Sequence, residues 1–412
     1  MDQLSFASLD FAAKKKRTKR DVFLTEMAAV VPWGALEALI EPHYPKVGPQ
    51  GGRRPFPLST MLHIYCLQQW YNLSDPGAEE ALYDIQSMRA FAGLELGCDA
   101  IPDETTILNF RHLLERHDLT KAIFAAVAEH LAAKGELLRG GTIVDATLIA
   151  ASPSTKNKEQ RRDPEMTSSK KGNQWYFGMK AHIGVDAESG LVHTAGVTTG
   201  KVHDAKVMVN LIREDDSAVY GDKGYASDEK KRAAEGAGVL WAVKEKAKPG
   251  RDLTKRQRAR NRRFGKVRAK VEHVFRVVKC QFGYRKVRYR GITKNGAQVF
   301  SLLALANLYL ARGRLAGERQ VETDASGRDI RVIDEKAATP GSNVILSIDL
   351  DLQAHVEQYV KEGLGGSLNA AAIVMDVHTG EILSLVSWPT YDNNIFTGEV
   401  DENALNQLLN DP

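Results

Sequence analysis

The stretch Thr142-Ile143-Val144-Asp145-Ala146-Thr147 places an aspartate directly after a run of three β-branched residues. β-Branched residues favour a strand, whereas aspartate has poor strand propensity and is costly to bury without a partner. The stretch therefore predicts a strand that carries a carboxylate in an unusual place. Taken alone, an ordinary aspartate at a strand edge is the simpler interpretation of Asp145.

On the C-terminal side of this strand, the sequence predicts a mixed sheet flanked by helices. Strands at 176–185 and 191–199 are bounded by glycine and polar turns, with Ser189-Gly190 as a hairpin turn. Hairpins followed by alternation of strands and helices indicate an α/β fold. The alternating elements are predicted helices at 204–213 and 227–235, strands at 218–220 and 239–243, and a long basic helix after them. The polar, Lys-rich segment 154–173 is predicted to be a solvated loop.

On the N-terminal side, residues from about 20 to 135 are predicted to form short helices. Ser59 stands where it can cap one helix, and Asp75-Pro76 and Pro102-Asp103 mark two further helix starts. Several short helices with tight connections fit a helix-turn-helix module and fit any small helical domain equally well. We therefore place a helical domain, a candidate for DNA binding, at 1–138 and an α/β domain at 139–316.

Length and composition narrow the class of protein. At roughly 150 residues per domain, 412 residues predict two or three domains. The 43% hydrophobic and 26% charged composition excludes collagen-like, coiled-coil and wholly disordered chains. No apolar run reaches the roughly 18 residues of a membrane span, and three distant cysteines offer neither a disulfide framework nor zinc spacing. The expectation is a cytoplasmic protein without a membrane segment.

The net charge of +4 conceals two regions of opposite charge. Residues 318–412 hold 17 acidic and 5 basic residues (net −12), which leaves 51 basic and 35 acidic residues (net +16) before them. From 245 to 290, 18 Lys and Arg residues stand against three acids, a density that suits a polyanion such as DNA. The candidate DNA-binding cations are Lys255, Arg256, Arg262, Arg263, Arg268, Lys279, Arg285 and Arg288.

Two further carboxylates share the unusual placement of Asp145. Asp222 ends the run Val219-Tyr220-Gly221, although an aspartate that satisfies a turn is its ordinary interpretation. On a helix of about 100° per residue, Glu272 falls on one shoulder of an apolar stripe, beside Arg268 and Lys279. The stripe consists of Val267, Val271, Val274, Phe275 and Val278. The alternative for Glu272 is a solvated ion pair with Arg268, worth a few tenths of a kcal/mol.

Three such carboxylates suit a site for divalent metal ions. Mg²⁺ prefers carboxylate oxygen and keeps several waters. Two ions about 3.5 to 4 Å apart stabilise both the attacking and the leaving oxygen of an in-line displacement at phosphorus. Asp145, Asp222 and Glu272 are therefore the candidate catalytic residues and ligands for Mg²⁺ or Mn²⁺.

Several stretches together resemble a known family. They are Pro102-Asp-Glu-Thr-Thr-Ile-Leu-Asn-Phe-Arg, Thr142-Ile-Val-Asp-Ala-Thr, Val219-Tyr-Gly-Asp-Lys-Gly-Tyr, Val267-Arg-Ala-Lys-Val-Glu-His-Val-Phe-Arg-Val-Val-Lys and Phe282-Gly-Tyr-x-Lys-Val-Arg-Tyr-Arg, with His203-Asp204 between them. With these stretches, most of residues 1 to about 316 resembles the DDE transposases of bacterial insertion sequences, specifically the insertion sequence five group. The family's Tyr-x2-Arg-x3-Glu-x6-Lys signature is met by Arg268, Glu272 and Lys279, but Gly265 stands at the tyrosine position.

The resemblance implies a fold, an activity and partners. The fold is RNase H-like, with Asp145, Asp222 and Glu272 as the metal-binding triad. The activity is cleavage and joining of double-stranded DNA at the terminal inverted repeats of a mobile element, followed by attack on target DNA without a covalent enzyme intermediate. It further implies a homo-oligomer assembled on DNA, associated with the nucleoid.

The acidic C-terminal part resembles a different family. The stretches Pro340-Gly-Ser-Asn-Val-Ile-Leu-Ser-Ile-Asp-Leu-Asp-Leu-Gln and Ala372-Ile-Val-Met-Asp-Val-His-Thr-Gly-Glu-Ile-Leu-Ser-Leu-Val-Ser look like the start of the transpeptidase domain of an elongation-type class B penicillin-binding protein. That family's Ser-x-x-Lys nucleophile motif is missing from this part of the chain. We expect a junction at 317–343 and, at 344–412, an incomplete α+β fragment with an apolar hairpin, as in a fusion of two reading frames.

Three classes of function follow. The first is a metal-dependent DNA transposase, an enzyme. The second is a DNA-binding chimera that has lost catalysis, which the basic helix alone would support but the three carboxylates oppose. The third is a peptidoglycan transpeptidase, suggested by the C-terminal part and opposed by its missing nucleophile motif.

Overall fold

The computed structural model divides the chain into two units, Met1–Pro340 and Gly341–Pro412, which are described separately. The residues that it describes are 16–47, 54–138, 140–158, 160–171, 173–247, 252–315, 318–323, 329–336, 349–364, 370–377, 379 and 381–388.

The first unit begins with helices, as predicted. They are α2 (Lys19–Val30), α3 (Trp33–Ile40), α4 (Leu58–Trp70), α5 (Asp75–Asp84), α6 (Gln86–Phe91), α7 (Glu104–Arg116) and α8 (Leu119–Ala133). Asp103 caps α7 as expected, since its side chain accepts a hydrogen bond from the Thr106 amide at 2.6 Å. Two predicted caps were wrong by one residue or more. The helix α4 begins after Pro57 without a side-chain cap, and Ser74 rather than Asp75 caps α5.

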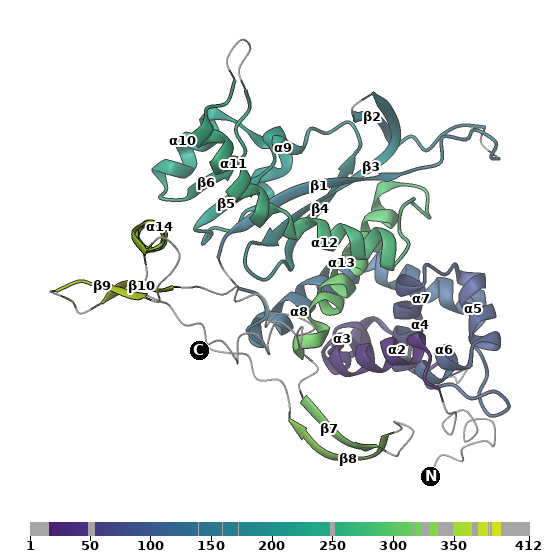
Figure 1. Ribbon diagram of the computed structural model, residues 1–412. Helices are drawn as coiled ribbons and strands as arrows, with labels where there is room; N and C mark the ends of the chain where they lie inside the picture. Colours follow the sequence, from purple (N-terminus) through teal and green to yellow (C-terminus); the bar gives the residue numbers. More distant parts are fainter. Residues whose placement is uncertain are drawn as a thin grey trace. The chain divides into compact units, whose positions relative to one another are not determined.

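A six-stranded mixed sheet follows the helices (Figure 1). Its strands are β1 (Thr142–Ala150), β2 (Thr167–Lys171), β3 (Gln174–Asp186), β4 (Val192–Thr199), β5 (Ala218–Gly221) and β6 (Leu240–Val243). The order is β2-β3-β1-β5-β6, with β4 also paired to β3. The pairs of β3 with β1, β2 and β4 are antiparallel, whereas β1, β5 and β6 run parallel. The predicted α/β fold is confirmed.

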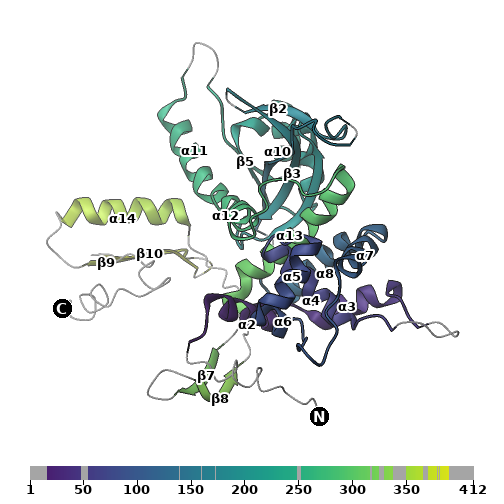
Figure 2. The same ribbon diagram turned by 90° about the vertical axis from the view of Figure 1, so that its right-hand side faces the viewer.

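Helices flank this sheet. They are α9 (Asp204–Val207), continued by a 3-10 turn at Met208–Leu211, α10 (Asp228–Gly236), α11 (Lys255–Arg268), α12 (Lys270–Arg276), continued by a π-helical turn at Val277–Gln281, and α13 (Ile292–Leu315). The apolar stripe predicted around Glu272 is confirmed, because Val271, Val274 and Val278 are buried. Figure 2 shows α11 lying along β5, which it contacts together with β6.

The helical part and the sheet share one hydrophobic core, so the boundary predicted at 138/139 does not separate two compact bodies. The reason is α13, which packs against α2, α4 and α8 as well as against β4. Asn307 of α13 also binds the Val192 amide and carbonyl at 2.8 and 2.7 Å. No single described helix is long and apolar enough to span a membrane; the bent pair α2 and α3 meets that criterion only together, by length and composition.

Two segments predicted to lack regular structure contain strands. The segment 154–173 includes β2, which pairs with β3 although its sequence Thr-Ser-Ser-Lys-Lys is polar. The predicted junction 317–343 includes β7 (Glu318–Thr323) and β8 (Asp329–Lys336), which form an antiparallel pair. Hydrogen bonds between backbones stabilise such strands, so the pattern of hydrophobic side chains does not predict them.

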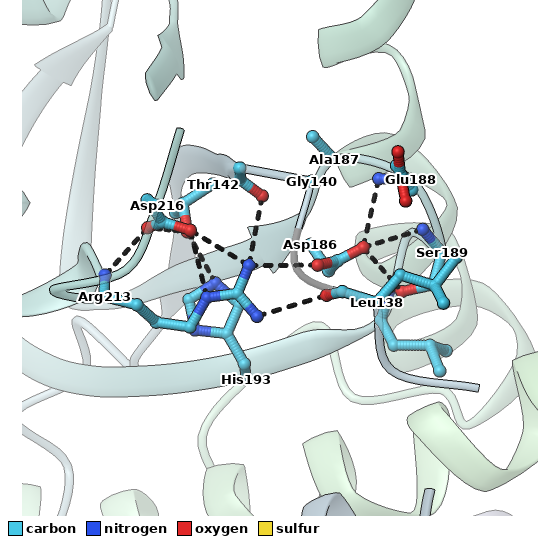
Figure 3. A network of polar contacts seen from close by, with 12 residues as sticks. Leu138, Gly140, Thr142, Asp186, Ala187, Glu188, Ser189, His193, Arg213 and Asp216 are labelled. Atoms are coloured by element: carbon cyan, nitrogen blue, oxygen red, sulfur yellow. Dashed lines mark hydrogen bonds and ion pairs between the residues drawn. The ribbon is translucent and has the colours of Figure 1, made fainter. Parts of the chain in front are cut away.

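A buried polar network fixes the start of β1 to the ends of its neighbours (Figure 3). Arg213 pairs with Asp186 at the end of β3, at 3.0 Å, and with Asp216 in the turn before β5, at 2.9 Å. Asp216 also accepts a hydrogen bond from the hydroxyl of Thr142, the first residue of β1. Burial and the nearby Arg213 cation lower the pKa of His193, which contacts Thr142 at 2.8 Å, to about 4. His193 is therefore neutral near pH 7, and the two aspartates share one cation.

The second unit contains α14 (Leu350–Leu364), β9 (Ala370–Met375) and β10 (Ile382–Trp388). The predicted helix and hairpin are confirmed, because β9 and β10 pair antiparallel and α14 packs against both. The predicted strand at 344–348 lies outside the described residues. We expect the apolar residues of this hairpin to be poorly buried or buried only against the tail itself; Ile373 and Ile382 are exposed (63% and 39%), and Val386 is buried.

Candidate active site

Asp145, inside β1, and Asp222, directly after β5, occupy neighbouring positions on two parallel strands. The register of β1 and β5 pairs Val144 with Gly221, and each aspartate is the next residue of its strand. Adjacent strands lie about 4.8 Å apart, and residues in register on parallel strands point to the same face. The sheet thereby places these two carboxylates side by side.

Glu272 is brought to the same place by Arg268. Nη2 of Arg268, the last residue of α11, donates to Oδ2 of Asp145 at 2.6 Å and to Oε1 of Glu272 at 3.3 Å. Both carboxylates therefore contact one nitrogen. Arg268 also interacts electrostatically with Asp222. We call Asp145, Asp222 and Glu272 the acid cluster.

The three carboxylates differ in their surroundings. The Asp145 side chain is only 13% exposed, and burial raises the pKa of this carboxyl, an effect that the Arg268 guanidinium opposes. Glu272 is 60% exposed. Burial thus disfavours the charged form of Asp145 and the nearby cation favours it, whereas Glu272 is open to solvent.

The donors of the acid cluster fit a hard divalent cation, although their present arrangement does not. Among the described residues, no group of three His, Cys, Asp or Glu side chains is placed to hold a metal ion. All the donors are carboxylate oxygens, which Mg²⁺ prefers. Beside them, Nε of Arg268 and the Tyr225 hydroxyl are buried without a partner within the described part of the chain. Arg268 currently supplies the positive charge between Asp145 and Glu272.

The helix α11 presents different residues to the sheet and to solvent. On its inner side, Gln257 donates to the Glu245 carboxylate at 2.7 Å, and Asn261 exchanges hydrogen bonds with the Glu245 backbone at 2.9 and 3.1 Å. Phe264, on the same side, makes an edge contact with Tyr220 at 6.3 Å between ring centroids. Glu245 is the second residue after β6, so these contacts fasten α11 to the end of that strand.

The outer side of α11 is basic. At about 100° per residue, Lys255, Arg262 and Lys266 fall within roughly 40° of one line, opposite Gln257 and Phe264. These three cations are exposed and form no ion pair within the described residues. The candidates Arg256 and Arg263 are also exposed and lie to one side of this line. We call five of the exposed cations of α11 the basic face; they are Lys255, Arg256, Arg262, Arg263 and Lys266.

The other three candidate cations contact the protein itself. Lys279 donates to the Leu148 carbonyl of β1 at 2.9 Å. Arg285 donates to the Lys279 carbonyl at 3.1 Å. Arg288 donates to the backbone carbonyls of Asn72 and Leu73, which ties the loop after α12 to the helical part. These contacts give all three a structural role.

Sequence reasoning missed Lys244, which extends the row of charged residues. The register of β5 and β6 pairs Gly221 with Val243, so Asp222 and Lys244 follow in register, and the Lys244 amide donates to the Gly221 carbonyl at 3.1 Å. A Cβ atom at Gly265 would lie 3.3 Å from Cε and Nζ of Lys244. The glycine at the family's tyrosine position therefore leaves space that the Lys244 side chain uses. The position of Lys244 beside Asp222 follows from the register of β5 and β6, which cannot be deduced from the sequence alone.

A mixed sheet that carries two carboxylates in register on adjacent parallel strands, with a third on a helix and a basic helix beside them, is suited to phosphoryl transfer on a nucleic acid. Residues 136–308 match a family model described as "Transposase DDE domain", and residues 11–113 match one described as "Transposase domain (DUF772)". The α/β region therefore matches a DDE transposase domain and is consistent with an RNase H-like fold, and the helical part matches a second transposase domain. Together the matches support a DNA transposase.

Proposed function

We propose that the chain cleaves and joins DNA at the ends of an insertion sequence by metal-dependent phosphoryl transfer, as in the insertion sequence five group. The observation that carries this proposal is the register of β1 and β5, which sets Asp145 beside Asp222, together with Arg268, which holds Glu272 to Asp145. Removing one carboxylate tests it, and that experiment opens the Discussion.

In this proposal, oxygens of Asp145, Asp222 and Glu272 hold Mg²⁺ or Mn²⁺. Two such ions would stabilise the attacking and leaving oxygens of an in-line displacement. Arg268 keeps two of the carboxylates together by offsetting their mutual repulsion. In the first step a water oxygen attacks phosphorus and loses its proton to solvent, and the bond to the 3′ oxygen breaks, which leaves a 3′ hydroxyl. In the second, the oxygen of that hydroxyl attacks a target-DNA phosphorus and loses its proton, and the bond from that phosphorus to the target's own 3′ oxygen breaks.

The partners follow from the charge of the surface. The proposal assigns to the basic face the backbone of double-stranded DNA, both at the terminal inverted repeats and in the target. Exposed cations that bind phosphates release the counterions condensed on the DNA, which favours binding. Since two ends must be cut and joined, we further propose that the chain acts as a homo-oligomer on DNA.

Neutralising the basic face should make DNA binding less sensitive to salt. For the triple variant Lys255→Gln/Arg262→Gln/Lys266→Gln, the slope of log K against log[salt] should become less negative by up to about 2.7, at about 0.9 per lost phosphate contact. Fluorescence anisotropy with a duplex of the element end, from 50 to 200 mM salt, measures this slope.

The control set for this prediction is Arg116→Gln/Lys121→Gln/Lys134→Gln, three exposed cations of the helical part. It removes the same charge from another surface. A salt slope changed as much by the control set as by the α11 set would contradict the assignment and point to the helical part as the main DNA surface.

For the C-terminal unit we propose no enzymatic function. Its hairpin exposes apolar side chains, and residues 318–412 contain no Ser-x-x-Lys motif of the kind that a penicillin-binding transpeptidase uses. A chain truncated after Ala316 is expected to cleave DNA as well as the full chain does, and neither should be labelled by a fluorescent penicillin. Covalent labelling of the full chain, or loss of cleavage on truncation, would overturn this assignment.

A further inference from the structure

We propose that Lys244 binds a backbone phosphate of the DNA strand next to the acid cluster, and that Gly265 provides the space that lets it do so. The inference deepens the proposed function and rests on it. It concerns a residue at the end of β6 that the family signature quoted above does not include.

The first argument is the position of Lys244 in the sheet. Asp145, Asp222 and Lys244 are the residues that follow three paired positions of β1, β5 and β6. With roughly 4.8 Å between neighbouring strands, Lys244 starts one strand from Asp222 and two from Asp145. A Lys side chain that starts there can reach the phosphate next to one held at the acid cluster, because successive phosphates of one strand are about 3.4 Å apart along the axis of duplex DNA.

The second argument is the face on which the side chain lies. Phe264 of α11 contacts Tyr220, and Arg268 of the same helix contacts Asp145. Tyr220 is two residues before Asp222, so both point to the face that α11 covers. Since the Lys244 ammonium lies against Gly265, between Phe264 and Arg268 in sequence, it lies on this face too.

The third argument is that the Lys244 charge has no partner. Arg268 is paired with Asp145 and Glu272, and Lys279 with the Leu148 carbonyl. The neighbouring acid, Glu245, is taken by Arg260 and Gln257 of α11. The half-buried Lys244 ammonium makes neither a hydrogen bond nor an ion pair within the described residues. A cation held in place without an anion beside a phosphoryl-transfer site is suited to a substrate phosphate.

The fourth argument is space. Lys244 lines a cavity of about 690 Å³ between β6, α10 and α11, to which Trp241, Lys246 and Phe264 also contribute. A strand that leaves the acid cluster over Asp222 therefore meets an open region with Lys244 at its border. The cavity gives an extended strand room that the packed helix α11 denies it elsewhere.

The test combines two substitutions with one modified DNA. Lys244→Met should lower the cleavage rate of an end-containing duplex in Mg²⁺ by roughly ten- to a hundredfold, the value of one charge-assisted hydrogen bond. Gly265→Ala adds a methyl group 3.3 Å from the ammonium, which must move. It should lower cleavage while keeping or raising the melting temperature, since alanine favours a helix over glycine.

The double variant Lys244→Met/Gly265→Ala should be no slower than Lys244→Met alone, because the methyl group acts only through the ammonium. Single methylphosphonate substitutions remove one phosphate charge at a time. At one position near the cleaved bond, the substitution should slow cleavage by the parent but should not change the cleavage rate of Lys244→Met. A merely structural role for Lys244 would not erase sensitivity at a single phosphate.

The outcomes separate the two proposals. A parent protein that does not cleave DNA in Mg²⁺ defeats the proposed function itself. If the parent cleaves DNA but Lys244→Met cleaves as fast as the parent, this inference alone is defeated. The same holds if methylphosphonate substitution slows Lys244→Met as much as the parent at every position. Additive losses in the double variant would likewise overturn the link between Gly265 and Lys244.

Discussion

Asp222→Asn is expected to reduce DNA strand cleavage by roughly a thousandfold or more, because a lost carboxylate ligand removes several kcal/mol of charge stabilisation at the reacting phosphate and each 1.4 kcal/mol is tenfold in rate. Asp222 is half-exposed and its side chain forms no hydrogen bond or ion pair within the described residues, so the amide should leave the fold intact. Binding of the element end should stay within a few-fold of the parent, since the basic face is untouched.

The measurement is single-turnover cleavage of an end-containing duplex in Mg²⁺ and in Mn²⁺, with binding followed separately. Glu272→Gln should behave like Asp222→Asn, because Glu272 is exposed and its only described partner is Arg268. The matched control is Asp228→Asn, an exposed acid at the start of α10 and six residues from Asp222. Parent-like cleavage by either acid-cluster variant would show that the cluster is not the metal site.

Most elements of the catalytic region could be predicted from the sequence because their signals are local. A β-branched run marked β1, and the helical spacing of apolar residues placed Glu272 of α12 beside Arg268 of α11. The contact between Arg268 and Glu272 was in fact the ordinary alternative for Glu272, and the structure contains it. It serves the site because Arg268 also reaches Asp145, 123 residues away in sequence.

The parts that sequence reasoning missed depend on pairing between distant segments. No local pattern reveals that Val144 pairs with Gly221 and Gly221 with Val243. The sequence therefore could not show that Lys244 lies next to Asp222 across the sheet. The strand β2 was missed because backbone hydrogen bonds to β3 hold a polar sequence. Helix starts shifted where two adjacent residues could both cap, as with Ser74 and Asp75.

The buried network around Arg213 was missed for the same reason, and it predicts the largest effect on stability. Arg213→Met should lower the free energy of unfolding by roughly 3 to 5 kcal/mol, because it leaves buried carboxylates without their cation. Asp186 and Asp216 have side chains exposed by only 0% and 1%, and both pair with Arg213. Urea unfolding of the full chain, followed by tryptophan fluorescence, measures the loss.

The control is Lys231→Met, which breaks an exposed pair with Glu235 on α10 and should cost under about 0.5 kcal/mol. A second readout is the pKa of His193, which burial and Arg213 together lower to about 4. Without Arg213 this pKa should rise, because the repelling cation is gone while Asp216 and Asp186 remain. A folded-state pKa below the unfolded value means that stability is lost as the pH falls from 6.5 toward the folded pKa of His193. Because this folded pKa is less depressed in Arg213→Met, the variant should lose less stability than the parent over that pH range.

The network also connects stability to the acid cluster. Thr142, bonded to Asp216, begins β1 three residues before Asp145, and Asp216 precedes β5, which ends beside Asp222. Loosening this end of the sheet weakens the register that sets the two aspartates side by side. In Arg213→Met, cleavage is therefore expected to fall at temperatures below the unfolding transition, while Lys231→Met cleaves as the parent does; an unchanged rate in a destabilised Arg213→Met protein would show that the acid cluster does not depend on this end of β1.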